Sequence, residues 1–446
     1  MRLLFFYLIL FICIALLTAR ADAQTSFTNT GVGETRFSAP SGMGSAVDLA
    51  GTNITIQNWQ QYRKYMSDGV QALFEGKYFW KMPVDVQIQV GPTVINWPPK
   101  NYLAATENYS GEVKLQELPD GGLTMTGYRG GLPFPKPSDP HEGWKILTDT
   151  YFRYMPHLSV INHAGSCAVD ANGDINCAGG DVVYRQISFN TDPGVPATVP
   201  GFADEFWTQW YMVTEPEQWR YTASLTIAYA DPQRPEDIYA FIPALRRYQP
   251  VSSLGRCSET YGMDFVPDDY RAGFDANLTQ MKVEYLGEKK VLALLLSDMP
   301  GGYPDAYEMP LGWPKPSWGK WQLRDVYVIS VSKLPKYASN YCYGKRVMYI
   351  DQTTFSTYWE ELYDAAMRPW KILGLYLHTI NVPGIGPVDE SASLIYSFWD
   401  IRQNHASFLG DPNDKGHPVY INDQVPLEYR DVHRYSTPAG LNLIMR

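Results

Sequence analysis

The chain has 446 residues, a formal net charge of −10 and 14% aromatic residues, with 32 Tyr and 13 Trp. An acidic chain lacks the basic surface that binding to nucleic acid requires, so we exclude that class of function. The aromatic residues are numerous enough to fill a large core, and they suit either an ordinary β-sheet or the wall of a cavity.

The first 23 residues have the pattern of a secretory signal peptide. Arg2 precedes an almost unbroken apolar run, and Ala21-Asp22-Ala23 offers a cleavage site of small residues. The run is shorter than the roughly 20 residues that span a bilayer, which favours cleavage after Ala23 over an uncleaved membrane anchor. We therefore expect an exported, periplasmic protein with no integral membrane span after cleavage.

The first part of the mature chain contains several expected elements. We expect an extended arm at 24–52 and a single domain at 53–446. Asn58 is expected to cap a helix that ends at Gly76, because apolar residues recur at helical spacing between them. Other expected elements are a strand at 84–90, one or two strands at 101–118, an irregular loop at 130–137, and a short helix followed by a strand at 141–155.

Four cysteines remain after the signal peptide, and they allow three connectivities. A three-residue hairpin loop at 171–173 places Cys167 opposite Cys177 on neighbouring strands, where a disulfide forms in an oxidising compartment. We predict this pair. Elimination then leaves Cys257 and Cys342 as a long-range pair.

The hairpin region also resembles the start of a calcium-binding loop, from Asp170 to Asp181. However, Ile175 stands where such a loop needs a glycine, and no bidentate glutamate closes it. We favour the hairpin, and calcium binding at 170–181 stays open as the alternative.

The stretch 221–296 organises the rest of the chain. Alternating side chains predict a strand at 221–229, and Asp231 to Pro235 then interrupts the pattern because its two prolines cannot donate to a sheet. We expect an antiparallel meander with one apolar face. Its further strands are expected at 238–242, 281–285 and 291–296, with a turn at 287–290, and strands outside it at 182–189, 326–331, 346–351, 358–363, 372–380 and 394–399.

Four segments of the chain occur together in a known order. They are Gly130 to Pro135; Ile238 to Tyr248 with Asp268-Asp269-Tyr270 and Gly273-Phe274; Lys345 to Asp351; and Leu362-Tyr363-Asp364 with Trp370. From about Asn53 to its C-terminus, the chain resembles the bacterial domain-of-unknown-function family 1329.

The resemblance implies a LolA/LolB-like fold, like that of the periplasmic lipoprotein carriers and their outer-membrane receptors. Such a fold is mainly β (α+β), with a large curved antiparallel sheet, or open half-barrel, that holds helices against its concave face over an apolar cavity. The family has no established enzymatic activity. The implied partners are an inner-membrane permease of the resistance-nodulation-division type and an outer-membrane protein.

Two pairs of charged residues lie in the signature segments, Arg246-Arg247 and Asp268-Asp269. We expect an ion pair between one arginine and one aspartate. Our hypothesis is that this pair is a polar switch, which closes the mouth of the sheet until a ligand competes for the arginine. Adjacent carboxylates on a strand point to opposite faces, so Asp268 and Asp269 make a poor acid/base pair.

The sequence contains no catalytic or metal-binding pattern that we recognise. Its seven histidines lack ligand spacing, and it has no nucleophile elbow, phosphate loop or dinucleotide fingerprint. We therefore expect no enzyme activity, no metal and no cofactor, but a carrier for an apolar or amphipathic molecule such as a lipid or a lipoprotein acyl chain. The alternative is an envelope assembly factor that binds another protein through the aromatic segments 207–219 and 313–321.

Overall fold

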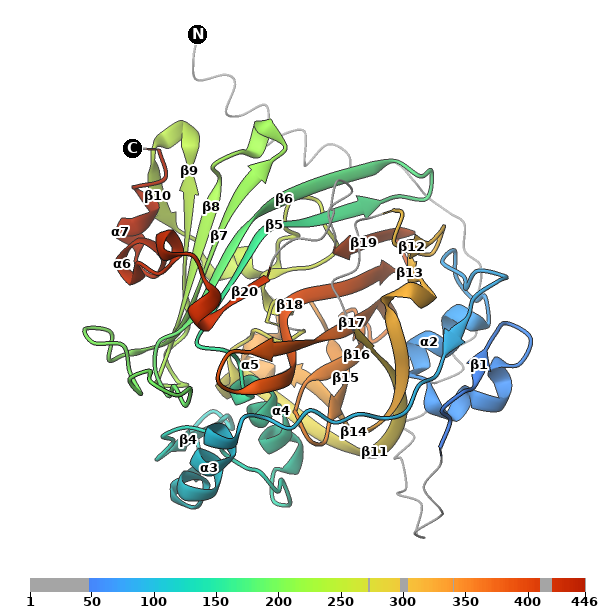
Figure 1. Cartoon of the computed structure of the whole chain (residues 1–446), viewed down its shortest axis with the longest axis horizontal. Coiled ribbons are helices and arrows are strands. Elements are labelled where there is room, and N and C mark those ends of the chain that lie inside the picture. The colour runs from blue at the N-terminus through green and yellow to red at the C-terminus, as the bar shows by residue number, and fades with distance from the viewer. Residues whose placement is uncertain (1–47, 272, 297–303, 340, 410–418, 446) are drawn as a thin grey trace. The chain divides into compact units, whose positions relative to one another are not determined.

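The computed structural model describes residues 48–271, 273–296, 304–339, 341–409 and 419–445. The predicted signal peptide, its cleavage site and nearly all of the predicted arm lie outside these residues. Within them, 14 strands form one large sheet, whose neighbours are antiparallel except for β11 and β17 (Figure 1). The expected class, mainly β with a large antiparallel sheet, is confirmed, and the helices are few.

Six strands in chain order form the first half of the sheet. They are β5 (Leu158–Val169), β6 (Ile175–Gln186), β7 (Glu205–Glu215), β8 (Ala223–Tyr229), β9 (Asp237–Ile242) and β10 (Arg247–Pro250). Each pairs antiparallel with the next. The predicted meander is therefore confirmed from β8 to β9, and it continues into β10, which the sequence did not predict.

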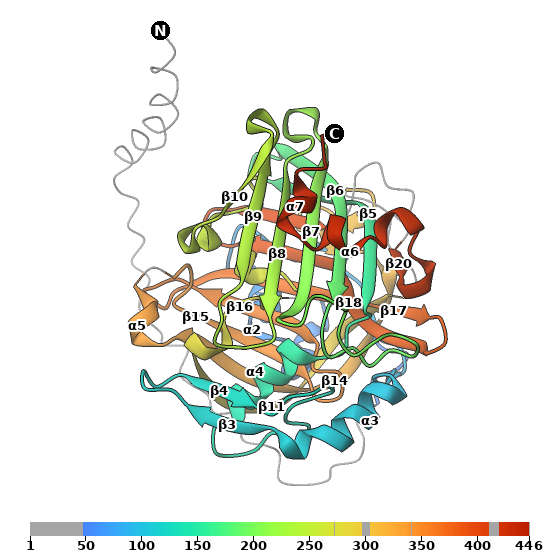
Figure 2. The same cartoon turned by 90° about the vertical axis from the view of Figure 1, so that its left-hand side faces the viewer.

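In the second half of the sheet, the strands curl and close into a ring. Its strands are β11 (Met281–Leu296), β14 (Gly319–Lys333), β15 (Lys345–Asp351), β16 (Thr357–Tyr363), β17 (Pro369–Val382), β18 (Gly386–Asp400) and β19 (His405–Leu409). The order β17, β11, β14, β15, β16 returns to β17, so five strands close into a ring. β18 and β19 connect this ring to β5, and Figure 2 shows its strands running across the upright strands of the first half.

One long strand, β11, replaces the two strands predicted at 281–285 and 291–296. β11 pairs with β14 from Met281 opposite Lys333 to Leu296 opposite Gly319. The predicted turn at 287–290 is part of this strand, and a β-bulge between Tyr285 and Gly287 is the irregularity in its pairing with β14. The prediction was wrong because a partner strand later in the sequence keeps this polar segment extended.

The helix predicted from Asn58 to Gly76 is broken in two. A 3-10 helix covers Trp59–Tyr65, and α2 covers Asp68–Phe74. The Val70 N–H donates to the Ser67 hydroxyl at 3.3 Å, so Ser67 starts a new helix. Asn58 does not cap the first helix, because its side chain accepts from the Thr55 N–H instead, at 2.7 Å.

Two other predictions before the first cysteine need correction. Residues 101–109 lie in a helix, α3 (Lys100–Tyr109), and not in a strand. The strand at 84–90 shrinks to β2 (Ile88–Gln89), which pairs with β1 (Asn53–Ile54). The helix predicted within 141–155 is confirmed as α4 (Glu142–Phe152). The remaining elements are β3 (Lys114–Glu117), β4 (Leu123–Thr126), β12 (Tyr307–Glu308), β13 (Trp313–Pro314), β20 (Val419–Ile421), α5 (Pro335–Ala338), α6 (Val432–Tyr435) and α7 (Pro438–Leu441).

Buried side chains cover both faces of the curled half. In β15, Val347 and Tyr349 join a cluster that includes α2, whereas Met348 and Ile350 join another that includes α4. Successive residues of a strand point to opposite faces, so α2 and α4 pack on opposite sides of β15. Both faces of β15 are therefore covered by packed side chains.

Both predicted disulfides are present, Cys167–Cys177 and Cys257–Cys342. The first joins β5 to β6 in the predicted register, with Val169 opposite Ile175. In its loop, the Asp170 carboxylate accepts backbone N–H groups of the loop itself, from Asn172 at 2.8 Å and Asp174 at 3.0 Å. Through these hydrogen bonds, Asp170 stabilises the turn of the hairpin.

Candidate functional site

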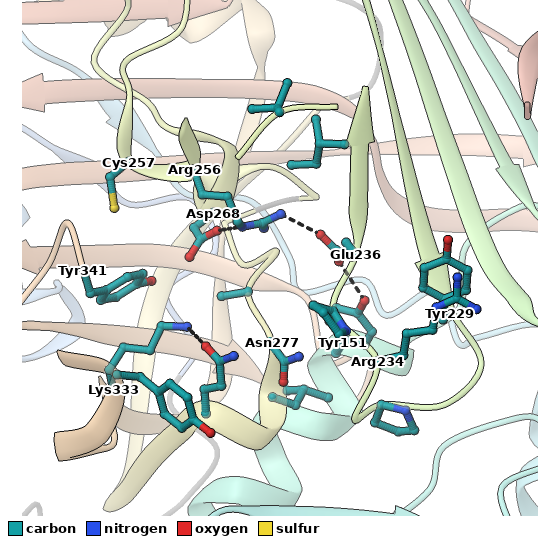
Figure 3. A pocket seen from close by; sticks show the side chains of 18 of the residues that line it. Tyr151, Tyr229, Arg234, Glu236, Arg256, Cys257, Asp268, Asn277, Lys333 and Tyr341 are labelled. Atoms are coloured by element: carbon teal, nitrogen blue, oxygen red, sulfur yellow. Dashed lines mark hydrogen bonds and ion pairs between the residues drawn. The ribbon is translucent and has the colours of Figure 1, made fainter. Parts of the chain in front are cut away.

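A cleft of about 440 Å³ lies among the described residues. Its wall is formed by the loop between β8 and β9, the segment around 251–257, the turn before β11, and the end of β14 with the residues that follow it. The cleft therefore borders the central stretch that the sequence singled out. Figure 3 shows Lys333 and Tyr341 on one side of this pocket and Arg234 and Tyr229 on the other.

The lining of the cleft is amphipathic. Its apolar part consists of Phe152, Pro232, Pro235, Ile238, Val251, Ala276 and Leu278. Its charged part consists of Arg234, Glu236, Arg256, Asp268, Lys333 and Lys336. This cleft therefore places charged groups beside its apolar surface.

Arg256 is the centre of the charged part. Its Nε donates to Asp268 Oδ1 at 2.5 Å, and its Nη1 donates to Glu236 Oε2 at 2.9 Å. The Tyr151 hydroxyl donates to the other Glu236 oxygen at 3.2 Å. Burial alone lowers the pKa of Arg256, but Glu236, Asp268 and Asp275 together raise this pKa above its ordinary value, so the guanidinium stays charged.

The predicted partners of the two aspartates were wrong. Asp268 pairs with Arg256, and Asp269 pairs with Arg346 at 3.1 Å, whereas we expected Arg246 or Arg247. Arg246 follows the 3-10 helix Pro243–Leu245 with a left-handed backbone, and Arg247 starts β10. Both residues are exposed. The two aspartates lie on a 3-10 helix, Pro267–Asp269, and bind different arginines.

Asp269 belongs to a cluster of buried charges. Arg346 donates through Nη2 to Asp269 and through Nη1 to Glu360, each at 3.1 Å, and it also donates to the Gly273 carbonyl. Burial raises the pKa of Glu360 to about 8, although Arg346 opposes the shift. Burial also raises the pKa of Asp269, again against Arg346. One arginine therefore holds two buried carboxyl groups.

Sequence reasoning found some members of these clusters and missed others. Asp268, Asp269 and Arg346 all lie in the signature segments, but their pairing has no local pattern. Glu236 and Arg256 were missed, since a charged residue in a loop looks the same whether it is buried or exposed. Lys333 was missed for the same reason, because it ends a strand and looks like a solvated lysine.

The aromatic segments proposed as a docking surface are largely internal. Trp207, Trp210, Trp313, Trp318 and Trp321 are all buried. Trp313 stacks on Trp321 with ring centroids 5.2 Å apart. The alternative hypothesis, a protein-binding surface made by these tryptophans, was therefore wrong, because their rings fill the core.

The family model of the protein of unknown function DUF1329 matches residues 53–441. The chain belongs to this family. Among proteins with curated functions, none matches the DUF1329 chain.

Three solved structures resemble the DUF1329 chain at low identity. A DUF1329 protein from Desulfovibrio piger is 12% identical, with a TM-score of 0.44, 66% of this chain covered and 98% of the other. A Vibrio parahaemolyticus domain, provisionally named an outer membrane lipoprotein-sorting protein, is 12% identical, with a TM-score of 0.43 and coverages of 69% and 99%. A LolA superfamily protein from Nitrosomonas europaea is 14% identical, with a TM-score of 0.35 and coverages of 63% and 92%. In the described part of the present chain, we find no helix with the length and apolar character to cross a membrane.

Proposed function

We propose that this DUF1329 protein is a periplasmic binding or carrier protein for an amphipathic molecule, such as a lipid or a lipoprotein acyl chain. The amphipathic cleft of about 440 Å³ is the observation that carries the proposal. Its volume lies in the range of roughly 300–1,000 Å³ that is typical of small-molecule sites. Apolar side chains would bind the tail, at roughly 25 cal/mol per Å² of apolar surface removed from water, and charged groups would face the head.

The protein would work in this proposal by binding alone, after export with a cleaved signal peptide. An inner-membrane permease and an outer-membrane protein would be its partners, as the family resemblance implies. The polar switch also becomes part of the proposal, with a changed partner: Asp268 pairs with Arg256 at the wall of the cleft, where an entering ligand would compete for the guanidinium.

Native mass spectrometry of the protein purified from periplasm tests this proposal. We expect a bound apolar or amphipathic molecule in the parent. Val251→Trp should abolish it, because Val251 lines the cleft and is 37% exposed, so the larger side chain enters the open space. Val84→Trp is the matched control, since Val84 is 82% exposed and does not line the cleft. A co-purifying polypeptide with no small molecule, or an unchanged ligand in Val251→Trp, would contradict the proposal.

A further inference from the structure

Positive charge is concentrated at the cleft of an acidic protein. The whole chain has a net charge of −10, yet four cationic side chains and only two carboxylates line the cleft. The cations are Arg234, Arg256, Lys333 and Lys336. Whether this lining attracts an anion depends on which of the four cations are already paired with carboxylates.

Three of the four cations already have a carboxylate partner. Arg256 pairs with Glu236 and Asp268, as described above. Lys336 lies 3.4 Å from Asp120. Arg234 lies 3.8 Å from Asp237, and its guanidinium also covers the Tyr229 ring at 3.2 Å from the ring centroid.

Lys333 is different. Its Nζ donates to Gln280 Oε1 at 2.9 Å and lies 4.7 Å from the centre of the Tyr341 ring. In the described part of the chain, no carboxylate oxygen lies within ion-pair distance of this ammonium, which has three N–H donors. Burial lowers the pKa of Lys333 to about 8, and the charge of Asp268 opposes this shift. A half-buried ammonium without a carboxylate is energetically costly, and a bound anion would offset this cost.

We propose that the cleft takes an amphiphile with an anionic head, a carboxylate or a phosphate, and that the Lys333 ammonium holds this head beside Gln280 and Tyr341. The apolar part of the lining, which includes Phe152 and Leu278, would cover the start of the tail. This inference rests on the proposed function and adds the chemistry of the ligand to it.

The test compares a long-chain carboxylate with its neutral and its short counterparts. The probes are oleate, oleyl alcohol and acetate, and their binding to the parent is measured by titration calorimetry at pH 7. We expect oleate to bind at least tenfold more tightly than oleyl alcohol, and acetate to show no binding. Lys333→Met should weaken oleate binding roughly ten- to a hundredfold, which is typical of a lost hydrogen bond to a charged group, and leave oleyl alcohol binding unchanged.

Two variants control for folding and for general charge. Lys333→Arg keeps the positive charge and should retain the preference for oleate. Lys336→Met removes a cation that also lines the cleft but is 64% exposed and paired with Asp120, so its effect on oleate should be under threefold. Melting curves of all variants confirm that each is folded.

The outcomes separate this inference from the proposed function. Equal binding of oleate and oleyl alcohol, or a Lys333→Met variant that keeps the preference, would overturn the anionic head and leave the carrier standing. Acetate binding as tight as oleate binding would overturn the amphiphile, because the site would then serve a small free anion. Failure of the parent to bind either long-chain probe would count against the carrier itself.

Discussion

Arg346 Nη2 donates a hydrogen bond to Asp269 Oδ1 at 3.1 Å, and this bond joins two residues that are 77 positions apart in the sequence. Both side chains are almost completely buried, and Glu360 completes the cluster. A buried charge must be paired, so this cluster fixes how the segment 267–271 packs against β15 and β16. The same segment supplies Asp268 to the cleft, so the buried cluster positions one wall of the proposed site.

Replacing the shared arginine should be strongly destabilising. Arg346→Ala leaves Asp269 and Glu360 without their partner, and we expect it to reduce the free energy of unfolding by about 3–5 kcal/mol. Arg247→Ala is the control, because Arg247 is exposed on β10, and we expect a change within about 0.5 kcal/mol. Urea unfolding followed by tryptophan fluorescence measures both. Equal effects of the two substitutions would show that the buried cluster has no special part in stability.

Position 273, beside this cluster, has room only for glycine. Its φ is +102°, and an added Cβ would lie 2.0 Å from Glu360 Oε1. We expect Gly273→Ala to cost roughly 2–4 kcal/mol of stability, since the backbone conformation is strained and the carboxyl must move. Gly384→Ala is the comparison, because Gly384 also has a positive φ, of +74°, but open space around it, and should cost about 1 kcal/mol. Thermal melting measures the stability of both variants. A lower melting temperature for Gly384→Ala than for Gly273→Ala would contradict this account.

The two disulfides should contribute unequally to stability. Cys257–Cys342 closes a loop with a sequence separation of 85, whereas Cys167–Cys177 closes one of 10. On the chain-entropy model, the stabilisation is about 4.5 kcal/mol for the long loop and about 3 kcal/mol for the short one. We therefore expect the double variant Cys257→Ser/Cys342→Ser to unfold at a lower urea concentration than Cys167→Ser/Cys177→Ser. The reverse order would show that local packing outweighs loop length.

Stability should fall as pH rises from about 5 to 8. Burial and then Asp68 raise the pKa of Glu361 to about 7, and burial raises that of Glu360 to about 8, both from 4.5. The folded state therefore binds these protons more tightly than the unfolded state. The resulting stabilisation is complete below pH 4.5 and is lost as pH rises through 7 and 8.

The size of this loss is on the order of 2–3 kcal/mol for Glu361 alone. His405 acts in the same direction, because the hydrogen bond with Asp264 raises its pKa. Above about pH 8 the trend should reverse in part, since burial lowers the pKa of Lys333 to about 8 and that of Lys289 as well. Unfolding at several pH values measures the slope, and Glu361→Gln should flatten it. A stability that is constant or rising between pH 5 and 8 would contradict these shifts.

Local patterns in the sequence predicted those features that depend on neighbouring residues. The register of Cys167 and Cys177 follows from a short loop between them, and β8 follows from alternation along one strand. Features set by distant partners were missed or wrong. The segment around Gly287 looks like a turn, but pairing with β14 keeps it extended. Nothing near Asp269 indicates that its partner is Arg346, and nothing near Lys333 indicates that Tyr341 will cover it.

Photo-crosslinking tests most directly whether the cleft holds the ligand. The probe is a long-chain fatty acid with a diazirine near its carboxylate, and peptide mass spectrometry maps its attachment. We predict attachment within the cleft-lining segments, at 229–238, 251–257, 276–280, 333–339 and at Tyr341, and its loss in Val251→Trp. Attachment elsewhere, for example along the exposed apolar residues of 94–97, with no labelling of the cleft, would contradict the account.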